Sequence, residues 1–156
     1  MPGRPVSLAI EYGPGLLARI AALCEADPER EVCGFVVRRR GLLEVEPIPN
    51  AADRYHAHDP VGFPRTSRDG YLMDPRAHLR LLQALDAEGG EVVAVWHSHV
   101  EVGAYFSARD RADALAGGLP VVPGAEYLVF GVRGGKVTEA RRFRLAGGDF
   151  VEWPLG

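Results

Sequence analysis

The stretch "VVAVWHSHVEVGAYFSARD", residues 92–110, decides the fold of this 156-residue sequence. It begins with the apolar run "VVAVW", which is typical of a strand buried on both faces in the middle of a sheet. It ends in "SARD", where Ser107 is placed to cap a short helix that we expect to end at Gly117–Gly118. A buried strand that leads into a helix predicts an α/β architecture.

Two further helices are expected before this strand. In "PGLLARIAALCEAD", residues 14–27, apolar side chains recur at helical spacing and Pro14 occupies a first-turn position. The segment "DPRAHLRLLQALDAEGG", residues 74–90, is amphipathic, begins at a capping Asp74 and stops at its two glycines. Both helices have an apolar side with which to cover a sheet.

The remaining strands are expected on either side of these helices. Residues 6–12 alternate like a first or edge strand, and residues 31–50 predict a hairpin that turns around Arg39–Gly41. The tail, residues 125–153, supplies two or three more strands. Residues 51–71 lack any period and predict a long loop, which in a compact domain is usually functional or mobile. We therefore expect an α/β (α+β) sandwich with a mixed β-sheet flanked by helices.

Length and composition narrow the class of protein. A chain with 47% hydrophobic and 25% charged residues is ordinary for a soluble domain, so we expect one domain over residues 1–156. The formal charge of −3 gives no electrostatic reason to bind nucleic acid or an anionic membrane. No apolar run approaches the roughly 18 residues of a membrane span. The absence of a secretory pattern at the start, and of enough cysteines for a disulfide framework, favours a cytoplasmic location.

The two histidines of "HSH" lie at the end of the predicted strand. Side chains two positions apart in a strand share a face, so His97 and His99 project side by side, while Trp96 and Ser98 point to the other face. Two imidazoles on one face are suitable ligands for a divalent metal, usually zinc. The alternative is that the pair is only the polar end of a strand.

Asp110 strengthens the metal interpretation. It lies eleven residues after His99, in the first turn of the helix capped by Ser107, where a short loop can bring its carboxylate back over the histidines. Three ligands and one open position are typical of a hydrolytic zinc site rather than a structural one. Ser107-x-x-Asp110 is also the signature of a capping box, which requires no metal, and the two roles can coexist.

Glu31 is the candidate for the proton transfer that a hydrolytic zinc site needs. Such a site requires a group that takes a proton from water and passes it to the leaving group. Glu31 stands at the start of the apolar segment "EVCGFVV". The alternative is that it is a solvated charge beside Arg30.

The segments "EVCG", residues 31–34, and "HSHVEVGAYFSARD", residues 97–110, together resemble the JAMM (MPN-plus) metalloproteases. The pattern of that family is a glutamate, then His-x-His, then a serine and an aspartate further along. The resemblance implies a cytidine-deaminase-like fold with a curved sheet. It also implies that zinc is bound by His97, His99 and Asp110. By the same resemblance Glu31 is the acid/base, and Ser107 donates a hydrogen bond near the oxyanion.

The resemblance also implies a function and a partner. Small stand-alone members of the family act on ubiquitin-like or sulfur-carrier proteins. We therefore expect a Zn²⁺-dependent isopeptidase or peptidase that cuts the amide bond after a C-terminal Gly-Gly. One alternative is a catalytically silent scaffold of the same fold that binds a ubiquitin-like partner without cutting it. The other is a zinc hydrolase for a different amide, such as a cell-wall peptide.

Two positions depart from the family pattern. Val100 and Phe106 stand where the family often has proline. Prolines at these positions shape the loop and do no chemistry. The departure therefore concerns the rigidity of the loop and the fit of the substrate strand.

Other histidines are weaker candidates. His56 and His58 lie in the expected loop between Asp53 and Asp59. The resemblance implies that this loop borders the substrate groove, so contact with substrate is favoured over a second metal site. His78 is expected to be an exposed residue of its helix.

Cys33 has two interpretations. It could form a thiol hydrolase pair with His97, since a thiol beside an imidazole is a possible nucleophile. Its position in an apolar strand, matching the Cys-Gly of the family, favours a buried thiol without a catalytic role.

Overall fold

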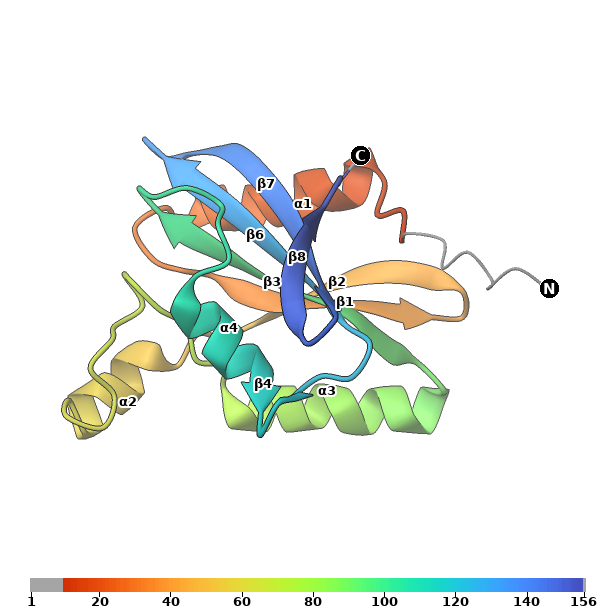
Figure 1. Ribbon diagram of the computed structural model, residues 1–156, viewed down its shortest axis with the longest axis horizontal. Coiled ribbons are helices and arrows are strands. Elements are labelled where there is room, and N and C mark those ends of the chain that lie inside the picture. Colours follow the sequence, from red (N-terminus) through yellow and green to blue (C-terminus); the bar gives the residue numbers. More distant parts are fainter. Residues whose placement is uncertain (1–9, 156) are drawn as a thin grey trace.

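The computed structural model describes residues 10–155, and over this range the chain forms a six-stranded sheet with helices packed against it (Figure 1). The helices are α1 (Pro14–Ala26), α2 (Ala52–His58), α3 (Pro75–Glu88) and α4 (Ala108–Ala114). The strands of the sheet are β1 (Cys33–Arg39), β2 (Leu42–Ile48), β3 (Glu91–Val100), β6 (Glu126–Arg133), β7 (Lys136–Ala146) and β8 (Asp149–Trp153). A separate hairpin consists of β4 (Leu115–Ala116) and β5 (Leu119–Pro120). The predicted α/β class is confirmed.

The apolar run quoted first is a central strand. The order in the sheet is β2-β1-β3-β6-β7-β8. β3 pairs antiparallel with β1 and parallel with β6, so the sheet is mixed, as predicted. Residues 93–99 of β3 are all buried, which explains why this segment shows no alternation of apolar and polar residues.

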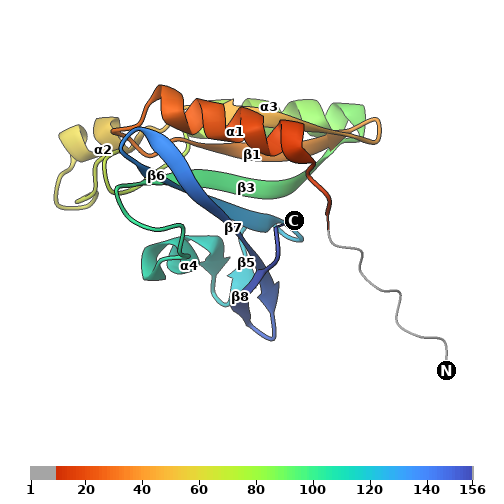
Figure 2. The same ribbon diagram turned by 90° about the horizontal axis from the view of Figure 1, so that it is seen from above.

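Two apolar clusters, one on each face, hold the helices to the sheet. One cluster joins Ile20 and Cys24 of α1 to Trp96 of β3. The other joins Leu81 of α3 and Phe106 to the opposite face of the sheet. Full burial of one such large apolar side chain stabilises the fold by about 1.5–3 kcal/mol. Figure 2 shows α4 and β8 on the side of the central strands away from α1.

The β1–β2 hairpin confirms the predicted turn. Arg39 pairs with Leu42, and between them Arg40 and Gly41 have φ angles of 53° and 79°. Two successive left-handed residues are characteristic of a two-residue hairpin turn, and glycine at the second position avoids the steric cost.

Residues 51–71 are not the continuous loop predicted from the sequence, because they contain α2. Ala51 is the N-cap of this helix, and the residue before it, Asn50, accepts a hydrogen bond at its Oδ1 from the Ala52 N–H at 3.0 Å. The ring of Tyr55 packs on Phe63 with centroids 5.0 Å apart, which folds the following loop back on the helix. A seven-residue surface helix contains too few turns to show apolar periodicity.

The predicted extent of two other elements was wrong. α4 ends at Ala114, because the chain then turns through Gly117 and Gly118, with φ angles of 59° and 81°, to form the hairpin of β4 and β5. The strand expected at residues 6–12 falls mostly on residues 1–9, outside the described range, and residues 10–12 are not in a strand. Within the described part of the chain, no helix is long and apolar enough to cross a lipid bilayer.

Candidate active site

The end of β3 presents both histidines on one face, as the two-residue alternation predicts. His97 is 0% exposed and His99 is 4% exposed. Ser98, between them, points to the opposite face, where its Oγ accepts a hydrogen bond from the Val32 N–H at 2.9 Å. The Ser98 N–H donates in turn to the Val32 carbonyl at 2.9 Å. These two bonds tie the histidine strand to the segment that carries Glu31.

Three potential ligand atoms converge at this point. His97 Nε2 lies 3.1 Å from His99 Nε2, and Asp110 Oδ2 lies 3.2 Å from each of them. Two atoms bonded to one tetrahedral zinc at about 2.0–2.1 Å are about 3.3 Å apart. The residues present therefore fit a zinc ion in both donor chemistry and spacing.

Asp110 reaches the histidines from the first turn of α4. Its backbone N–H donates to Ser107 Oγ at 2.9 Å, and the Ser107 N–H donates to Asp110 Oδ2 at 3.1 Å. The capping box is therefore present, and the same carboxylate faces His97 and His99. Asp110 can therefore complete the capping box and face the two histidines at the same time, as the sequence allowed.

The two imidazoles are oriented by different contacts. His99 Nδ1 lies 2.9 Å from the carbonyl of Gly103, and because a carbonyl only accepts, we assign a proton to Nδ1; the lone pair of the neutral ring is then on Nε2, and the protonated ring can donate from Nε2 to Asp110. His97 instead stacks on the ring of Tyr71, with centroids 4.5 Å apart and an interplanar angle of 27°. His97 Nδ1 has no hydrogen-bond partner among residues 10–155. Sequence reasoning missed Tyr71, because nothing in a loop residue indicates which ring it will meet.

The local charges favour an ionised Asp110. Burial alone would raise its pKa, but the charge and hydrogen bond of His97, the hydrogen bond from His99 and the N–H of Ser107 together hold the pKa well below its ordinary value. Burial opposes a charge on His99 too, yet its contacts with Asp110 and the Gly103 carbonyl raise the pKa of His99. An ionised carboxylate facing two imidazoles is a suitable anionic ligand for a metal.

Glu31 is buried, with 6% of its surface exposed, so the alternative of a solvated charge is wrong. Its ligand atom and those of His97 and His99 all lie within 4.8 Å of one another. Burial raises the pKa of Glu31 to about 8; the charge of His99 opposes this rise and that of Asp110 adds to it. Glu31 and Asp110 thus both lie near the two histidines: Glu31 completes a group of three potential ligands with them, and Asp110 contacts each of them at 3.2 Å.

Asn50 holds the backbone around Glu31, and the sequence analysis missed it. Its Nδ2 donates to the Glu31 carbonyl at 2.8 Å and to the Gly70 carbonyl at 3.1 Å. Its Oδ1 accepts from the N–H groups of Ala52 and Leu72, each at 3.0 Å. All four hydrogen-bonding positions of this amide are therefore used. An asparagine directly before a helix is a recognisable helix-start signal, but its bonds to Glu31 and Gly70 are not.

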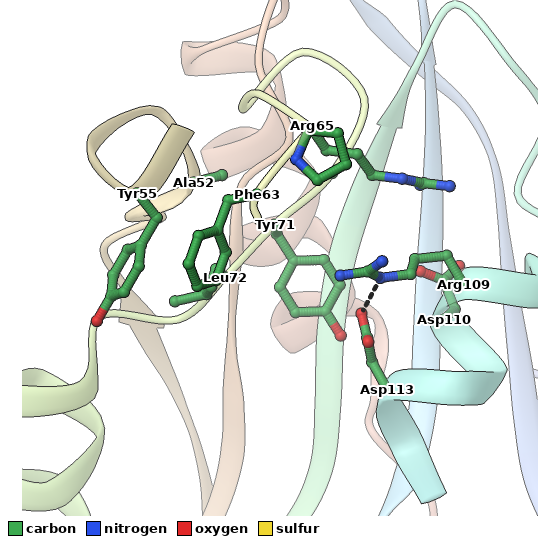
Figure 3. Close-up of a pocket in the computed structure, with 11 residues that line it drawn as sticks. Ala52, Tyr55, Phe63, Arg65, Tyr71, Leu72, Arg109, Asp110 and Asp113 are labelled. Atoms are coloured by element: carbon green, nitrogen blue, oxygen red, sulfur yellow. Dashed lines mark hydrogen bonds and ion pairs between the residues drawn. The ribbon is translucent and has the colours of Figure 1, made fainter. Parts of the chain in front are cut away.

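A pocket lies beside Asp110 and is walled by the loop after α2 (Figure 3). Its side chains include aromatic rings on one side and charged groups on the other: Tyr55, Phe63, Tyr71, Arg65, Arg109, Asp110 and Asp113. Arg109 Nε pairs with Asp113 Oδ2 at 3.1 Å. The pocket therefore offers apolar walls and guanidinium groups next to the proposed metal.

The other three histidines do not belong to the cluster around His97 and His99. His56 Nδ1 contacts the Phe63 carbonyl at 2.8 Å, and within residues 10–155 neither it nor His58 belongs to a group of three potential ligands. His78 is not exposed as predicted but half-buried, because its ring packs on Phe35 with centroids 4.9 Å apart.

Cys33 is a buried thiol, as the sequence favoured. It donates to the Ile48 carbonyl at 3.4 Å. Burial, with a smaller effect from the charge of Glu31, raises the pKa of Cys33 to about 12. Since only a thiolate is a good nucleophile, burial and the bond to Ile48 favour the buried thiol without a catalytic role, although Cys33 is the register partner of His97.

Three curated relatives are similar to most of the chain. A probable TtuB-protein conjugate cleaving protease of Thermus thermophilus is 32% identical over 133 residues, covering 85% of this chain and 77% of the relative. A desampylase of Haloferax volcanii is 28% identical over 132 residues, covering 83% and 82%. A CysO-cysteine peptidase of Mycobacterium bovis is 25% identical over 140 residues, covering 90% and 85%.

The fold and the family are shown independently. A solution structure of a Desulfitobacterium hafniense protein matches with a TM-score of 0.64 at 20% identity, covering 90% of this chain and 86% of that one, which shows a shared fold. The sequence model of a family described as prokaryotic homologs of the JAB domain matches residues 14–146, a range that contains Glu31, both histidines of β3 and Asp110. The resemblance to the JAMM metalloproteases is therefore confirmed, and this chain belongs to the prokaryotic homologs of the JAB domain.

Proposed function

We propose that this protein is a zinc-dependent peptidase that cuts the amide bond after the C-terminal Gly-Gly of a ubiquitin-like or sulfur-carrier protein. The observation that carries the proposal is the convergence of His97, His99 and Asp110, with donor atoms 3.1–3.2 Å apart, beside the buried carboxyl group of Glu31. A scaffold that only binds a partner needs no such cluster of buried ionisable groups, so the cluster favours an enzyme.

The names of the relatives support the substrate class. One relative is described as a protease that cleaves TtuB-protein conjugates, and another as a peptidase for CysO-cysteine. Both names describe cleavage between a named protein, TtuB or CysO, and the group joined to it. We extend this activity to the present chain.

His97, His99 and Asp110 would hold the metal. When bound, zinc supplies Lewis acidity, which polarises a carbonyl group and makes water a stronger acid. Asp110 contributes the anionic ligand, and its carboxylate is kept in place by the Ser107 N–H. The Gly103 carbonyl orients His99 so that Nε2 is the ligand atom.

Glu31 and Ser107 perform the remaining steps. Glu31 takes a proton from the attacking water and delivers it to the leaving amine, a role that suits a buried carboxyl group whose pKa lies near neutrality. Ser107 Oγ accepts a hydrogen bond from the Asp110 N–H, and its own hydroxyl proton can be donated to the oxyanion.

Two tyrosines restrict what approaches the metal. The ring of Tyr71 lies against His97, and Tyr105, which is 52% exposed, meets the edge of His99 with centroids 5.0 Å apart. A substrate backbone passing between these rings is least obstructed where it carries no Cβ, which favours glycine. The neighbouring pocket, with its aromatic walls and Arg109, receives the group that leaves.

Mass spectrometry of a sulfur-carrier protein with a short C-terminal extension tests the proposal. The zinc-loaded protein is expected to cut after the second glycine, and a chelator is expected to stop the reaction. Replacing either glycine by alanine should slow cleavage far more than changing the residue that leaves. Equal rates for the alanine and glycine substrates would contradict the Gly-Gly requirement. Tight binding without any cleavage would favour the scaffold alternative.

A further inference from the structure

One peptide group joins His99 to a distant carboxylate. His99 Nδ1 donates to the Gly103 carbonyl at 2.9 Å, and the Ala104 N–H donates to Glu139 Oε1 at 2.6 Å. The carbonyl of Gly103 and the N–H of Ala104 belong to the same planar amide, whose resonance couples its two ends. Glu139, on β7, is therefore linked to His99 through a single peptide unit.

Two glycines make room for this arrangement. A Cβ on Gly103 would lie 2.8 Å from Glu139 Oε1, so the Glu139 carboxylate would have to move away from its present position. Gly131 of β6 is the register partner of Glu139, and a Cβ there would lie 3.2 Å from Glu139 Cγ and 3.3 Å from the Ala104 nitrogen. Neither glycine has a positive φ, so space rather than backbone conformation accounts for glycine at these positions.

The loop that carries this peptide group is held by tertiary contacts. Ala104 is 1% exposed, and Phe106 packs on Phe143 and Phe150 with ring centroids 5.2 and 4.9 Å apart. The Glu101 N–H donates to the Val132 carbonyl at 2.8 Å. These contacts and the hydrogen bond to Glu139 hold the loop in place, although it lacks the family prolines at positions 100 and 106.

We propose that Glu139 is a positioning residue of the metal centre, which acts on His99 through the Gly103–Ala104 peptide group. The charged acceptor polarises this amide and strengthens its carbonyl as an acceptor for the Nδ1 proton. A stronger bond at Nδ1 fixes the ring and its tautomer and makes Nε2 a better ligand, as a directly bonded carboxylate does for other metal-binding histidines. This inference rests on the metal site of the proposed function.

The charge state of Glu139 is consistent with this role. The hydrogen bond from the Ala104 N–H is the main cause that lowers the pKa of Glu139, and contacts with Arg141 lower it further. Arg141 forms ion pairs with both Glu139, at 3.3 Å, and Glu152, at 3.0 Å. Glu152 is therefore a matched control for the loss of one surface charge.

Zinc affinity, measured on the full chain by competition with a chromogenic chelator, tests the inference. Glu139→Ala is expected to weaken zinc binding about 10–100-fold, the usual effect of removing a partner that supports a ligand. Glu139→Gln, which keeps an acceptor oxygen but no charge, should lie between Glu139→Ala and the native protein. Glu152→Gln should bind zinc like the native protein. Unchanged affinity in Glu139→Ala would overturn the proposal.

A second measurement separates positioning from a general loss of structure. In the metal-free protein labelled with ¹⁵N-histidine, the His99 Nδ1–H signal should move upfield and exchange faster in Glu139→Gln, while the His78 signals stay unchanged. A His99 signal that does not move would overturn the proposal even if affinity fell. If the native protein bound no zinc, both the inference and the proposed function would fail. If it bound zinc but cut no substrate, only the proposed function would fail.

Discussion

At the scale of single residues, the pKa values of the carboxyl groups of Glu31 and Asp110 are shifted in opposite directions within one site. Each is 6% exposed, so burial acts on both. The pKa of Glu31 rises to about 8 because burial outweighs the favourable charge of His99. The pKa of Asp110 falls, because the charge and hydrogen bonds around it outweigh the same burial. Contacts rather than residue type therefore separate the proposed acid/base from the proposed ligand.

Glu31→Gln is expected to keep its zinc and to lose at least about a hundredfold in rate, since glutamine has a similar shape but cannot take up a proton. Zinc content by elemental analysis and initial rates on the extended sulfur carrier provide the measurement. Glu29→Gln, a change in an exposed neighbour, is the control and should leave both unchanged. Loss of metal together with activity would show instead that Glu31 is a ligand.

At the scale of elements, the active site depends on how the segment before β1 meets the loop after α2. The Glu31 N–H donates to the Ser67 carbonyl at 2.5 Å, and Asn50 bridges Glu31 to Gly70. Asp53 of α2 accepts from both the N–H and the Oγ of Ser67, each at 2.7 Å. α2 and the loop therefore hold the backbone of Glu31, the proposed acid/base, in place.

Asn50→Ala is expected to destabilise the fold by about 1–3 kcal/mol, because backbone groups that it satisfies lose their partner. It should also lower kcat with little change in zinc content, since Glu31 moves while the ligands stay. Chemical unfolding, metal analysis and steady-state kinetics provide the readouts. Thr66→Ala, which removes a 3.3 Å hydrogen bond in the same loop, is the control and should change stability by less than about 0.5 kcal/mol. Native kcat in Asn50→Ala would contradict a bracing role.

At the scale of the whole molecule, the site is assembled from segments far apart in the chain. Glu31 precedes β1, the histidines end β3, and Asp110 begins α4. The proposed ligands thus meet only when the sheet and α4 have formed. Zinc that binds the native state alone must stabilise the fold as a whole.

Zinc at about 100 times its Kd is expected to stabilise the native state by about 2.7 kcal/mol, which for a domain of this size raises Tm by roughly 5–10 °C. Calorimetry of metal-free protein with and without zinc provides the measurement. His99→Ala should abolish the shift because it removes a ligand. His58→Ala, on exposed α2, should retain it. Equal zinc content in His99→Ala and native protein would overturn the ligand assignment, and a smaller shift in His58→Ala would revive a second metal site.

Local sequence patterns were sufficient for the elements that position the proposed ligands. The alternation of a strand placed His97 and His99 on one face, and the spacing of Ser107 and Asp110 predicted the capping box. The hairpin turn at Arg39–Gly41 was also predictable. Each of these features depends on the backbone geometry of a few contiguous residues, which the residue types themselves determine.

Contacts between distant segments were decided only by the tertiary structure. Glu31 is buried at a point where its backbone is bonded to two distant residues, its N–H to the Ser67 carbonyl and its carbonyl to the Asn50 side chain. The stacking of Tyr71 on His97 and the link from Glu139 to His99 join residues that no local pattern relates. α2 was missed because tertiary contacts rather than periodicity maintain so short a helix. The sequence by itself determined which reactive side chains are available. The order of strands in the sheet determined which of these side chains lie together. Contacts between distant segments depend on the topology of the chain, whereas local patterns report only the backbone geometry of adjacent residues.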